Sequence, residues 1–363
     1  MDAELRRRLA DVERKVRSGE RLGHEDGVAL FASDDLAWLG GLAHEARALK
    51  NGDVAYFAEH RRLELPAEAD AVNDTDAVND TDAMNDMVEA ATRLAADGAT
   101  ELHLGAAGDT SWEQWVRALR ALRAALPEAV ALRAFTAADV SRFAAASQVS
   151  ESEVLDELLA AAPASLGEGF EGPGAEAADA EDAEDVAREA EGAGWQDWAR
   201  VHRMAHHKGL TTVCTLRFGY GEELAERVDH LLRLRELQDE TGGFRAVVPL
   251  RHEGPQGATG AEVLATFAVC RLLLDNVAHV AARWAVHGAQ TSQLALQHGA
   301  DEMAGPPAAE ASRDADVLTR DDLVELIRDT GFRPVERDAH HGVLRSFDGP
   351  DPDRREAPQP MRV

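Results

Sequence analysis

A strand–helix–strand pattern between residues 211 and 250 constrains the fold more than any other part of the sequence. Residues 211–218 (TTVCTLRF) and 244–250 (FRAVVPL) are short apolar runs, and residues 222–240 separate them. The separating segment carries apolar side chains at helical spacing, namely Leu224, Val228, Leu231 and Leu234. Two strands joined by one helix through short loops must lie parallel, with a right-handed crossover. The sequence therefore predicts an α/β fold built on a parallel sheet.

Strand and helix patterns alternate along most of the chain. Residues 101–105 (ELHLG) and 130–135 (VALRAF) are further strand candidates, and a helical pattern at 112–125 lies between them. Repetition of such units over about 250 residues is typical of a (β/α) barrel. No G-x-G-x-x-G motif opens the first unit, as a dinucleotide-binding sheet would require. We predict a TIM-like (β/α) barrel, with its chemistry at the carboxyl ends of the strands.

The chain divides into four expected parts. They are an N-terminal helical region (1–52), the barrel (53–305), a C-terminal closing segment (306–348) and a disordered tail (349–363). Two low-complexity loops are expected within the barrel, at 66–87 and 167–194. The first contains a six-residue repeat, DAVNDTDAVNDTDAMND, without the glycine that an EF-hand calcium loop needs. The second is rich in Gly, Ala, Asp and Glu and has few apolar residues.

The charge balance excludes several classes of partner. The formal net charge is −29, and only three of the 38 basic residues are lysine. This composition favours a halophilic protein whose carboxylate surface stays hydrated in a salt-rich cytoplasm. Such a surface repels nucleic acid and anionic membranes, so neither is expected as a partner. The first twenty residues have no signal-peptide core and no apolar run approaches 18 residues, so we expect a cytoplasmic protein.

Several segments, taken in order, resemble one enzyme family. They include GATELHLGAAGD (98–109), RVDHLLRLRELQDETGGF (227–244), LLLDNVAHVAARWAVHG (272–288), GADEMAG (299–305) and PVERD (334–338). The sequence resembles the radical S-adenosylmethionine (radical SAM) enzymes that include aminofutalosine synthase of menaquinone synthesis and the deazaflavin (FO) synthase subunits. The resemblance implies a radical-SAM-type barrel with helical N-terminal and C-terminal additions. It also implies a [4Fe–4S] cluster and S-adenosylmethionine as cofactors.

The residues that carry this chemistry in the family differ here. The family holds its cluster by three cysteines, spaced C-x-x-x-C-x-x-C, shortly after the segment matching 54–62. This chain has LELPAEADAVNDTDAVNDTDAM at that place, and its two cysteines, Cys214 and Cys270, lie in apolar segments that favour buried structural thiols. The family's glycine pair after the second strand corresponds to Ala106-Ala107. The histidine of its Y-G-H-x-E motif corresponds to Tyr220.

From these differences we predict a degenerate family member. In this interpretation the protein has lost radical chemistry, binds no cofactor, and persists as a small-metabolite-binding protein or as the partner of an intact radical SAM paralogue. The alternative is an enzyme of the lineage, a transferase on a menaquinone or deazaflavin precursor, which uses S-adenosylmethionine without the usual cluster motif.

No catalytic residue and no metal ligand is assigned from the sequence, but one candidate ligand pocket is. Its expected residues are Glu101, His103, Thr136, Glu222, Asn276 and His279. Glu101 and His103 alternate with leucines, so both should face the inside of the barrel, where Arg133 on the next strand is a suitable partner. A functional pocket and a structural polar layer remain equal alternatives for them.

Other histidines and one ion pair are expected to be structural. The spacing of His202 and His206 allows a zinc pair, but no H-E-x-x-H motif supports it. We therefore favour surface or groove positions for His206-His207 and His340-His341. Arg337 and Asp338 are expected to form an ion pair that closes the barrel.

Overall fold

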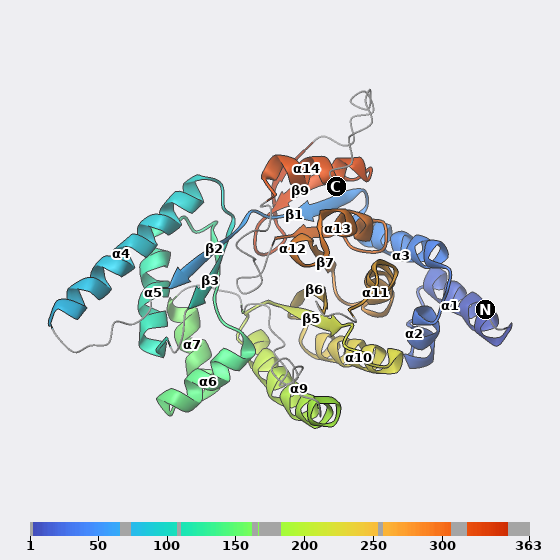
Figure 1. Ribbon diagram of the computed structural model, residues 1–363, viewed down its shortest axis with the longest axis horizontal. Helices are drawn as coiled ribbons and strands as arrows, with labels where there is room; N and C mark the ends of the chain where they lie inside the picture. The colour runs from blue at the N-terminus through green and yellow to red at the C-terminus, as the bar shows by residue number, and fades with distance from the viewer. Residues whose placement is uncertain are drawn as a thin grey trace.

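The computed structural model describes residues 3–65, 74–106, 110–161, 166, 183–252, 257–305 and 318–347 (Figure 1). The strands in these ranges are β1 (Val54–Phe57), β2 (His60–Leu65), β3 (Glu101–Ala106), β4 (Ala131–Arg133), β5 (Thr212–Phe218), β6 (Phe244–Arg251), β7 (His279–Arg283), β8 (Glu302–Ala304), β9 (Arg333–Arg337) and β10 (Val343–Ser346). They form a seven-stranded sheet, in the order β10-β9-β1-β8-β7-β6-β5, and a three-stranded sheet, in the order β2-β3-β4. Every pairing is parallel except that of β9 with β10.

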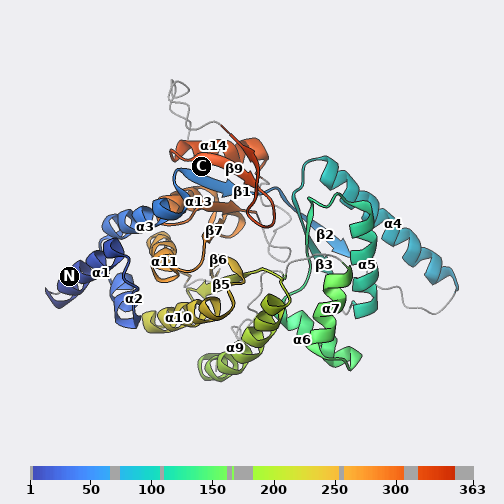
Figure 2. The ribbon, with the colours of Figure 1, turned by 180° about the vertical axis from the view of Figure 1, so that it is seen from behind.

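The two sheets share one stretch of chain. β1 pairs with β8 and β9, and β2, which begins three residues after β1 ends, pairs with β3. Figures 1 and 2 show helices outside both sheets, with α4 (Asp74–Ala96) and α5 (Trp112–Ala125) beside the three-stranded one. These parallel strands with helices on the outside confirm the predicted TIM-like (β/α) barrel.

The remaining helices cover the rest of the barrel. They are α1 (Ala3–Ser18), α2 (His24–Phe31), α3 (Leu36–Asn51), α6 (Ala137–Ser147), α7 (Glu151–Ala161), α9 (Ala183–His207), α10 (Leu224–Thr241), α11 (Gly260–Leu273), α12 (Trp284–His287), α13 (Ala289–Leu296) and α14 (Arg320–Asp329). The strand–helix–strand unit predicted at 211–250 is β5, α10 and β6. In the described part of the chain, no helix is long and apolar enough to cross a membrane.

Both predicted low-complexity loops are wrong where the structure describes them. α4 begins at Asp74, inside the six-residue repeat, because the amphipathic segment that buries Met87 and Ala91 extends backward. Likewise, α9 begins at Ala183, since Ala and Glu are strong helix formers and precede an amphipathic helix. Residues 66–73, 167–182, 306–317 and 348–363 lie outside the described ranges.

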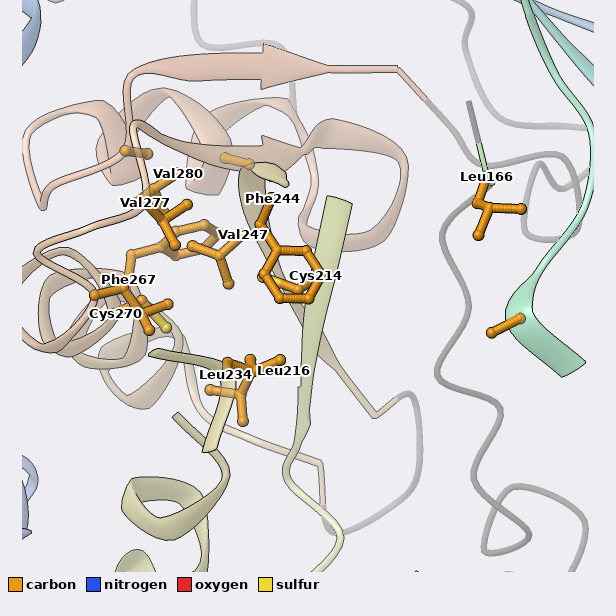
Figure 3. Close-up of a cluster of buried hydrophobic side chains, with 14 of the residues drawn as sticks. Leu166, Cys214, Leu216, Leu234, Phe244, Val247, Phe267, Cys270, Val277 and Val280 are labelled. Carbon is orange, nitrogen blue, oxygen red and sulfur yellow. The ribbon is translucent and has the colours of Figure 1, made fainter. Parts of the chain in front are cut away.

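The two cysteines lie in the main hydrophobic core, between the strands and the outer helices. Figure 3 shows Cys214 on β5 and Cys270 on α11 among Leu216, Phe244 and Phe267. Neither cysteine is exposed, and burial raises the pKa of both thiols. The prediction that they are buried structural thiols is confirmed.

The inner face of the barrel differs from one side to the other. Inward residues of β5–β8, together with Val286 of α12, form a separate small apolar cluster, made of Val213, Ala246, Val248, Leu250, Ala281, Val286 and Ala304. The residues of β3 that alternate with its core leucines are instead Glu101 and His103, and both are buried. One wall of the barrel is therefore apolar, and the opposite wall is charged.

Candidate functional site

Three parallel strands end in a buried arginine at the same edge of the barrel. Arg133 ends β4, Arg283 ends β7 and Arg337 ends β9. Their exposed fractions are 5%, 0% and 3%. Charged side chains are rarely buried without a partner, and active sites of (β/α) barrels lie at the carboxyl ends of the strands. This edge is therefore the candidate functional site.

Glu101 lies between two of these arginines. Its Oε2 accepts a hydrogen bond from Arg133 Nε at 2.7 Å, and its Oε1 accepts one from Arg337. The predicted pairing of Glu101 with Arg133 is confirmed, while Arg337 adds a link from the three-stranded sheet to the seven-stranded one. Burial alone would raise the pKa of Glu101, but the two arginines outweigh it and hold that pKa well below its usual value. Glu101 is therefore an anion inside the barrel.

Two histidines face the same carboxylate. The strand register places His60 opposite Glu101, and His103 is two residues further along the same face. His60 Nε2 and His103 Nε2 lie 3.4 and 3.5 Å from Glu101 Oε2, and their ring centroids are 4.9 Å apart. Neither ring nitrogen of His60, nor Nε2 of His103, has a hydrogen-bond partner. Burial lowers the pKa of His60 well below its usual value and that of His103 to about 4, so both rings are neutral.

Arg337 does not pair with the side chain of Asp338, so that prediction is wrong. Neighbouring residues of a strand point to opposite faces. Arg337 points inward, where it binds Glu101 and Glu302, whereas the carboxylate of Asp338 accepts hydrogen bonds from backbone N–H groups of the next turn. His341 binds Glu302 through Nε2 at 2.9 Å, and 5% of its side chain is exposed. Its expected surface position is also wrong.

Of the six predicted pocket residues, Glu101 and His103 lie together at the site. Thr136 follows β4 and caps α6, where its hydroxyl accepts from Asp139 N. Glu222 follows β5 and accepts from the N–H groups of Gly219 and Tyr220 and from Arg227. Both residues lie on the carboxyl side of the strands, but the side-chain oxygens of each already make hydrogen bonds to neighbouring residues.

The other two predicted residues lie at the opposite end of the strands. Asn276 precedes β7 and donates hydrogen bonds to Arg235 O and to Asp239. His279 begins β7, roughly 13 Å along the strand from Arg283, and its Nδ1 lies 2.6 Å from Asp301 Oδ2. Asp301 is in turn held by Arg271. The structure therefore separates this pair from Glu101 and His103.

Sequence reasoning missed His60, Arg283 and the inward role of Arg337. The E-L-H spacing placed Glu101 and His103 on one face, but His60 joins them only through the register of β2 on β3. Each of the three arginines is the last residue of a parallel strand. For Arg133, this position could be predicted from the sequence once the strand had been assigned.

Beyond His60, the inner face of β2 opens to solvent. Arg62 and Glu64 form an ion pair there, and 37% and 47% of their side chains are exposed. Gly105 on β3 lies against this pair, since a Cβ at that position would approach Glu64 Oε2 to 2.8 Å. The site therefore passes from a buried charged layer to an accessible polar one towards the carboxyl end of β2.

The histidine pair on α9 belongs to the core. His202 Nδ1 and His206 Nε2 each lie 2.9 Å from the hydroxyl of Thr212 on β5. His206 is buried, so its expected surface position is wrong. Because the hydroxyl engages one nitrogen of each ring, this pair is explained by helix–strand packing.

The two thiols do not fit the cluster that the resemblance implies. Such a cluster needs three thiolates near the loop after β2, whereas Cys214 and Cys270 lie on β5 and α11 in the outer core. Burial also favours the neutral thiol over the ligating thiolate. The cysteines of this chain therefore provide no cluster site.

Comparisons with known proteins point to one family. Residues 248–347 match the family model described as the CofH/MqnC C-terminal region. The chain is 49% identical to aminodeoxyfutalosine synthase of Streptomyces coelicolor, over 100% of both chains, and 32% identical to that of Thermus thermophilus, over 94% of this chain and 97% of the relative. Among solved structures, the hydrogenase maturase HydG of Carboxydothermus hydrogenoformans matches with a TM-score of 0.60 and 14% identity, over 92% of this chain and 81% of that one. The HydG likeness shows the fold alone.

These matches contradict the prediction that no cofactor is used. The full-length relatives belong to the radical SAM family, whose members use an iron–sulfur cluster and S-adenosylmethionine. We therefore withdraw that prediction. The poor fit of the two thiols is a separate finding, and it concerns only which residues of this chain could serve as cluster ligands.

Proposed function

The chain belongs to the radical SAM family of aminodeoxyfutalosine synthase, and from that premise we propose that it is an enzyme of this lineage. In this proposal it uses S-adenosylmethionine and acts on a precursor of menaquinone or of a deazaflavin. The observation that carries the proposal is the 49% identity to aminodeoxyfutalosine synthase over the whole of both chains.

The charged wall of the barrel supports an enzymatic role. Arg133, Arg283 and Arg337 are buried at this wall, where Arg133 and Arg337 bind Glu101 and Arg337 also binds Glu302. Arginines at the carboxyl ends of barrel strands suit an anionic group, such as the carboxylate of S-adenosylmethionine or of a substrate. The apolar wall of β5–β8 faces the charged wall and offers a surface for the uncharged part of a ligand.

A second candidate function is a metabolite-binding partner of an intact family member. The specific observation in its favour is that the sequence contains two cysteines, both buried in the core. The alignment with the Streptomyces relative also spans 405 positions, so at least 42 of them (405 less 363) have no counterpart in this chain. Both candidates require ligand binding within the barrel, but only the first requires turnover.

The test separates binding from turnover. The purified chain is treated anaerobically with iron and sulfide in high salt, and bound iron is measured. Binding of S-adenosylmethionine is measured by calorimetry. Formation of 5′-deoxyadenosine or of an adenosyl adduct is then followed by mass spectrometry after addition of a reductant. The matched control is the double variant Cys214→Ala/Cys270→Ala, since iron that it retains cannot be held by either thiol.

The expected result is saturable binding of S-adenosylmethionine and its turnover in the presence of a precursor substrate. Binding without turnover, together with co-purification of a second family member, would favour the partner role. Absence of both binding and turnover in folded protein would contradict the proposed enzyme.

A further inference from the structure

We propose that His60, Glu101 and His103 form a binding site for a divalent first-row metal ion of the Zn²⁺ or Fe²⁺ type. The site would be separate from any iron–sulfur cluster, and it goes beyond the function proposed above. In the described part of the chain, these residues are the one group of three such side chains whose ligand atoms all lie within 4.8 Å of one another.

The distances match a metal site better than a hydrogen bond. Tetrahedral zinc binds imidazole nitrogen and carboxylate oxygen at 2.0–2.2 Å, so two of its ligand atoms lie about 3.4 Å apart. The two histidine Nε2 atoms lie 3.4 and 3.5 Å from Glu101 Oε2. A charge-assisted hydrogen bond would shorten these distances to about 2.8 Å, yet neither nitrogen has a hydrogen-bond partner. An ion bound to all three atoms would satisfy both of these buried nitrogens.

The donor atoms also suit a metal ion. Ligands must present lone pairs, which imidazole nitrogens and carboxylate oxygens supply. The Nε2 atoms of the buried His60 and His103 have no hydrogen-bond partner, and Glu101 is held between Arg133 and Arg337. Two imidazoles and one carboxylate form a donor set that suits zinc or non-haem iron, and this set leaves at least one coordination position open.

The surrounding residues hold the carboxylate in place. Arg337 binds Oε1 of Glu101, and Arg133 Nε donates to Oε2, which retains a second lone pair for an ion. Such outer hydrogen bonds to ligating carboxylates are usual in metal sites and fix the orientation of the ligand. At Gly305, a Cβ would lie 2.9 Å from His60 Cβ, so the absence of a side chain there lets His60 take its position.

The nearby arginines determine what fills the open position. Because Arg133 and Arg337 already pair with Glu101, a bare divalent ion would add uncompensated positive charge to a buried site and would be strongly disfavoured. An anionic fourth ligand removes this cost. We assign that position to hydroxide, which zinc generates from water near neutral pH, or to an anionic oxygen of a bound ligand.

The site is tested with Zn²⁺ alone. The chain is stripped of metal with a chelator, equilibrated with Zn²⁺ in high potassium chloride, which screens weak binding to the acidic surface, and analysed for bound zinc. The variants are His60→Gln and His103→Gln. The control is His206→Gln, which removes a buried histidine that packs on Thr212 instead. Circular dichroism confirms the fold of each variant.

One zinc per chain is expected in the unaltered protein and in His206→Gln, with at least about 100-fold weaker binding in His60→Gln and His103→Gln. Equal zinc binding in all four proteins would overturn the site. Should a variant fail to fold, Co²⁺ added to the unaltered chain decides the question, because the visible absorption of tetrahedral Co²⁺ must appear. Its absence would overturn the proposal. Stabilisation by phosphate without zinc uptake would also do so, and would indicate an anion site among the arginines.

Discussion

The two sheets of the barrel bury different chemistry on their inner faces. The inner face of β5–β8 carries a small apolar cluster that includes Val213, Ala246, Ala281 and Ala304, and every residue of β7 and β8 is buried. On the three-stranded sheet, β2, β3 and β4 carry His60, Glu101, His103 and Arg133 towards the inside. The inner face of the seven-stranded sheet therefore combines apolar packing with the charges of Glu302 and Arg337, whereas that of the three-stranded sheet is mainly polar and charged.

This difference between the sheets separates the part of the chain that the family model matches from the part that carries most of the buried charged residues. The family model matches residues 248–347, which include β7–β10 and the second half of β6. The three-stranded sheet precedes that region and is joined to it through β1 and through Arg337, which binds Glu101 on β3 and Glu302 on β8. The apolar packing of the barrel can persist while the residues after β2 change. The buried charged residues, in contrast, must keep their ion-pair partners, because an unpaired buried charge is strongly destabilising.

Replacing Arg337 should produce the largest effect, because it breaks the link between the sheets. Arg337→Met leaves Glu302 buried with His341 as its remaining side-chain partner and removes one cation from Glu101. Loss of one partner of a buried ion pair costs about 3–5 kcal/mol. The free energy of unfolding, from urea titration in high salt, should fall by that amount.

The matched control is Arg345→Met on the adjacent strand β10, whose residues are exposed. An exposed substitution should change the free energy of unfolding by less than about 0.5 kcal/mol. If Arg337→Met behaves like this control, the charged wall does not hold the two sheets together, and the contrast between the sheets is wrong.

The fold was predictable because its signals are local. The apolar runs of β5 and β6 and the amphipathic α10 specify a parallel unit, and repetition of the unit specifies a barrel. The beginning of α4 at Asp74 was missed because the low-complexity repeat obscured it. The helix extends back into the repeat because residues further along it, such as Met87, make apolar contacts with the core.

The site was predictable only in part because it depends on register. The alternation of Glu101 and His103 was visible, and Arg133 followed from the next strand. The inclusion of His60 depends on how β2 pairs with β3, and that of Arg337 on β9 pairing with β1 across 280 residues of chain. Asn276 and His279 lie apart from Glu101 and His103, because they stand before and at the start of β7, where His279 pairs with Asp301.

Acid should weaken the seven-stranded sheet through two buried histidines, as it should weaken the three-stranded sheet through His60 and His103. Burial lowers the pKa of His206, beside β5, and of His287, beside β6, to about 4. Because both folded pKa values lie below the usual 6.5, the stability these neutral rings provide is complete above pH 6.5 and is lost as pH falls towards 4. Each contributes a slope of up to about 1.4 kcal/mol per pH unit. Glu101, whose pKa is well below its usual value, keeps its contribution until lower pH.

The measurement is the free energy of unfolding at several pH values between 7.5 and 4.5. His206→Gln and His287→Gln should each reduce the slope by about one proton. His340→Gln, which replaces an exposed histidine, is the control and should leave the slope unchanged. A slope that none of the three substitutions alters would place the acid sensitivity elsewhere, with His60 and His103 on the three-stranded sheet as the remaining candidates.

The smallest expected effect concerns Thr136, which follows the three-stranded sheet and was predicted as a ligand-pocket residue. Its hydroxyl and the carboxylate of Asp139 cap the first turn of α6, with Thr136 N to Asp139 Oδ2 at 2.9 Å. Thr136→Ala removes the side-chain cap and should lower the free energy of unfolding by about 1 kcal/mol, whereas Thr136→Ser should restore it. The affinity for S-adenosylmethionine, measured by calorimetry, should be the same in all three proteins, because the hydroxyl is occupied by the cap. A loss of affinity in Thr136→Ala that Thr136→Ser rescues would instead return Thr136 to the pocket, and the functional part of the charged wall would then extend beyond the end of β4.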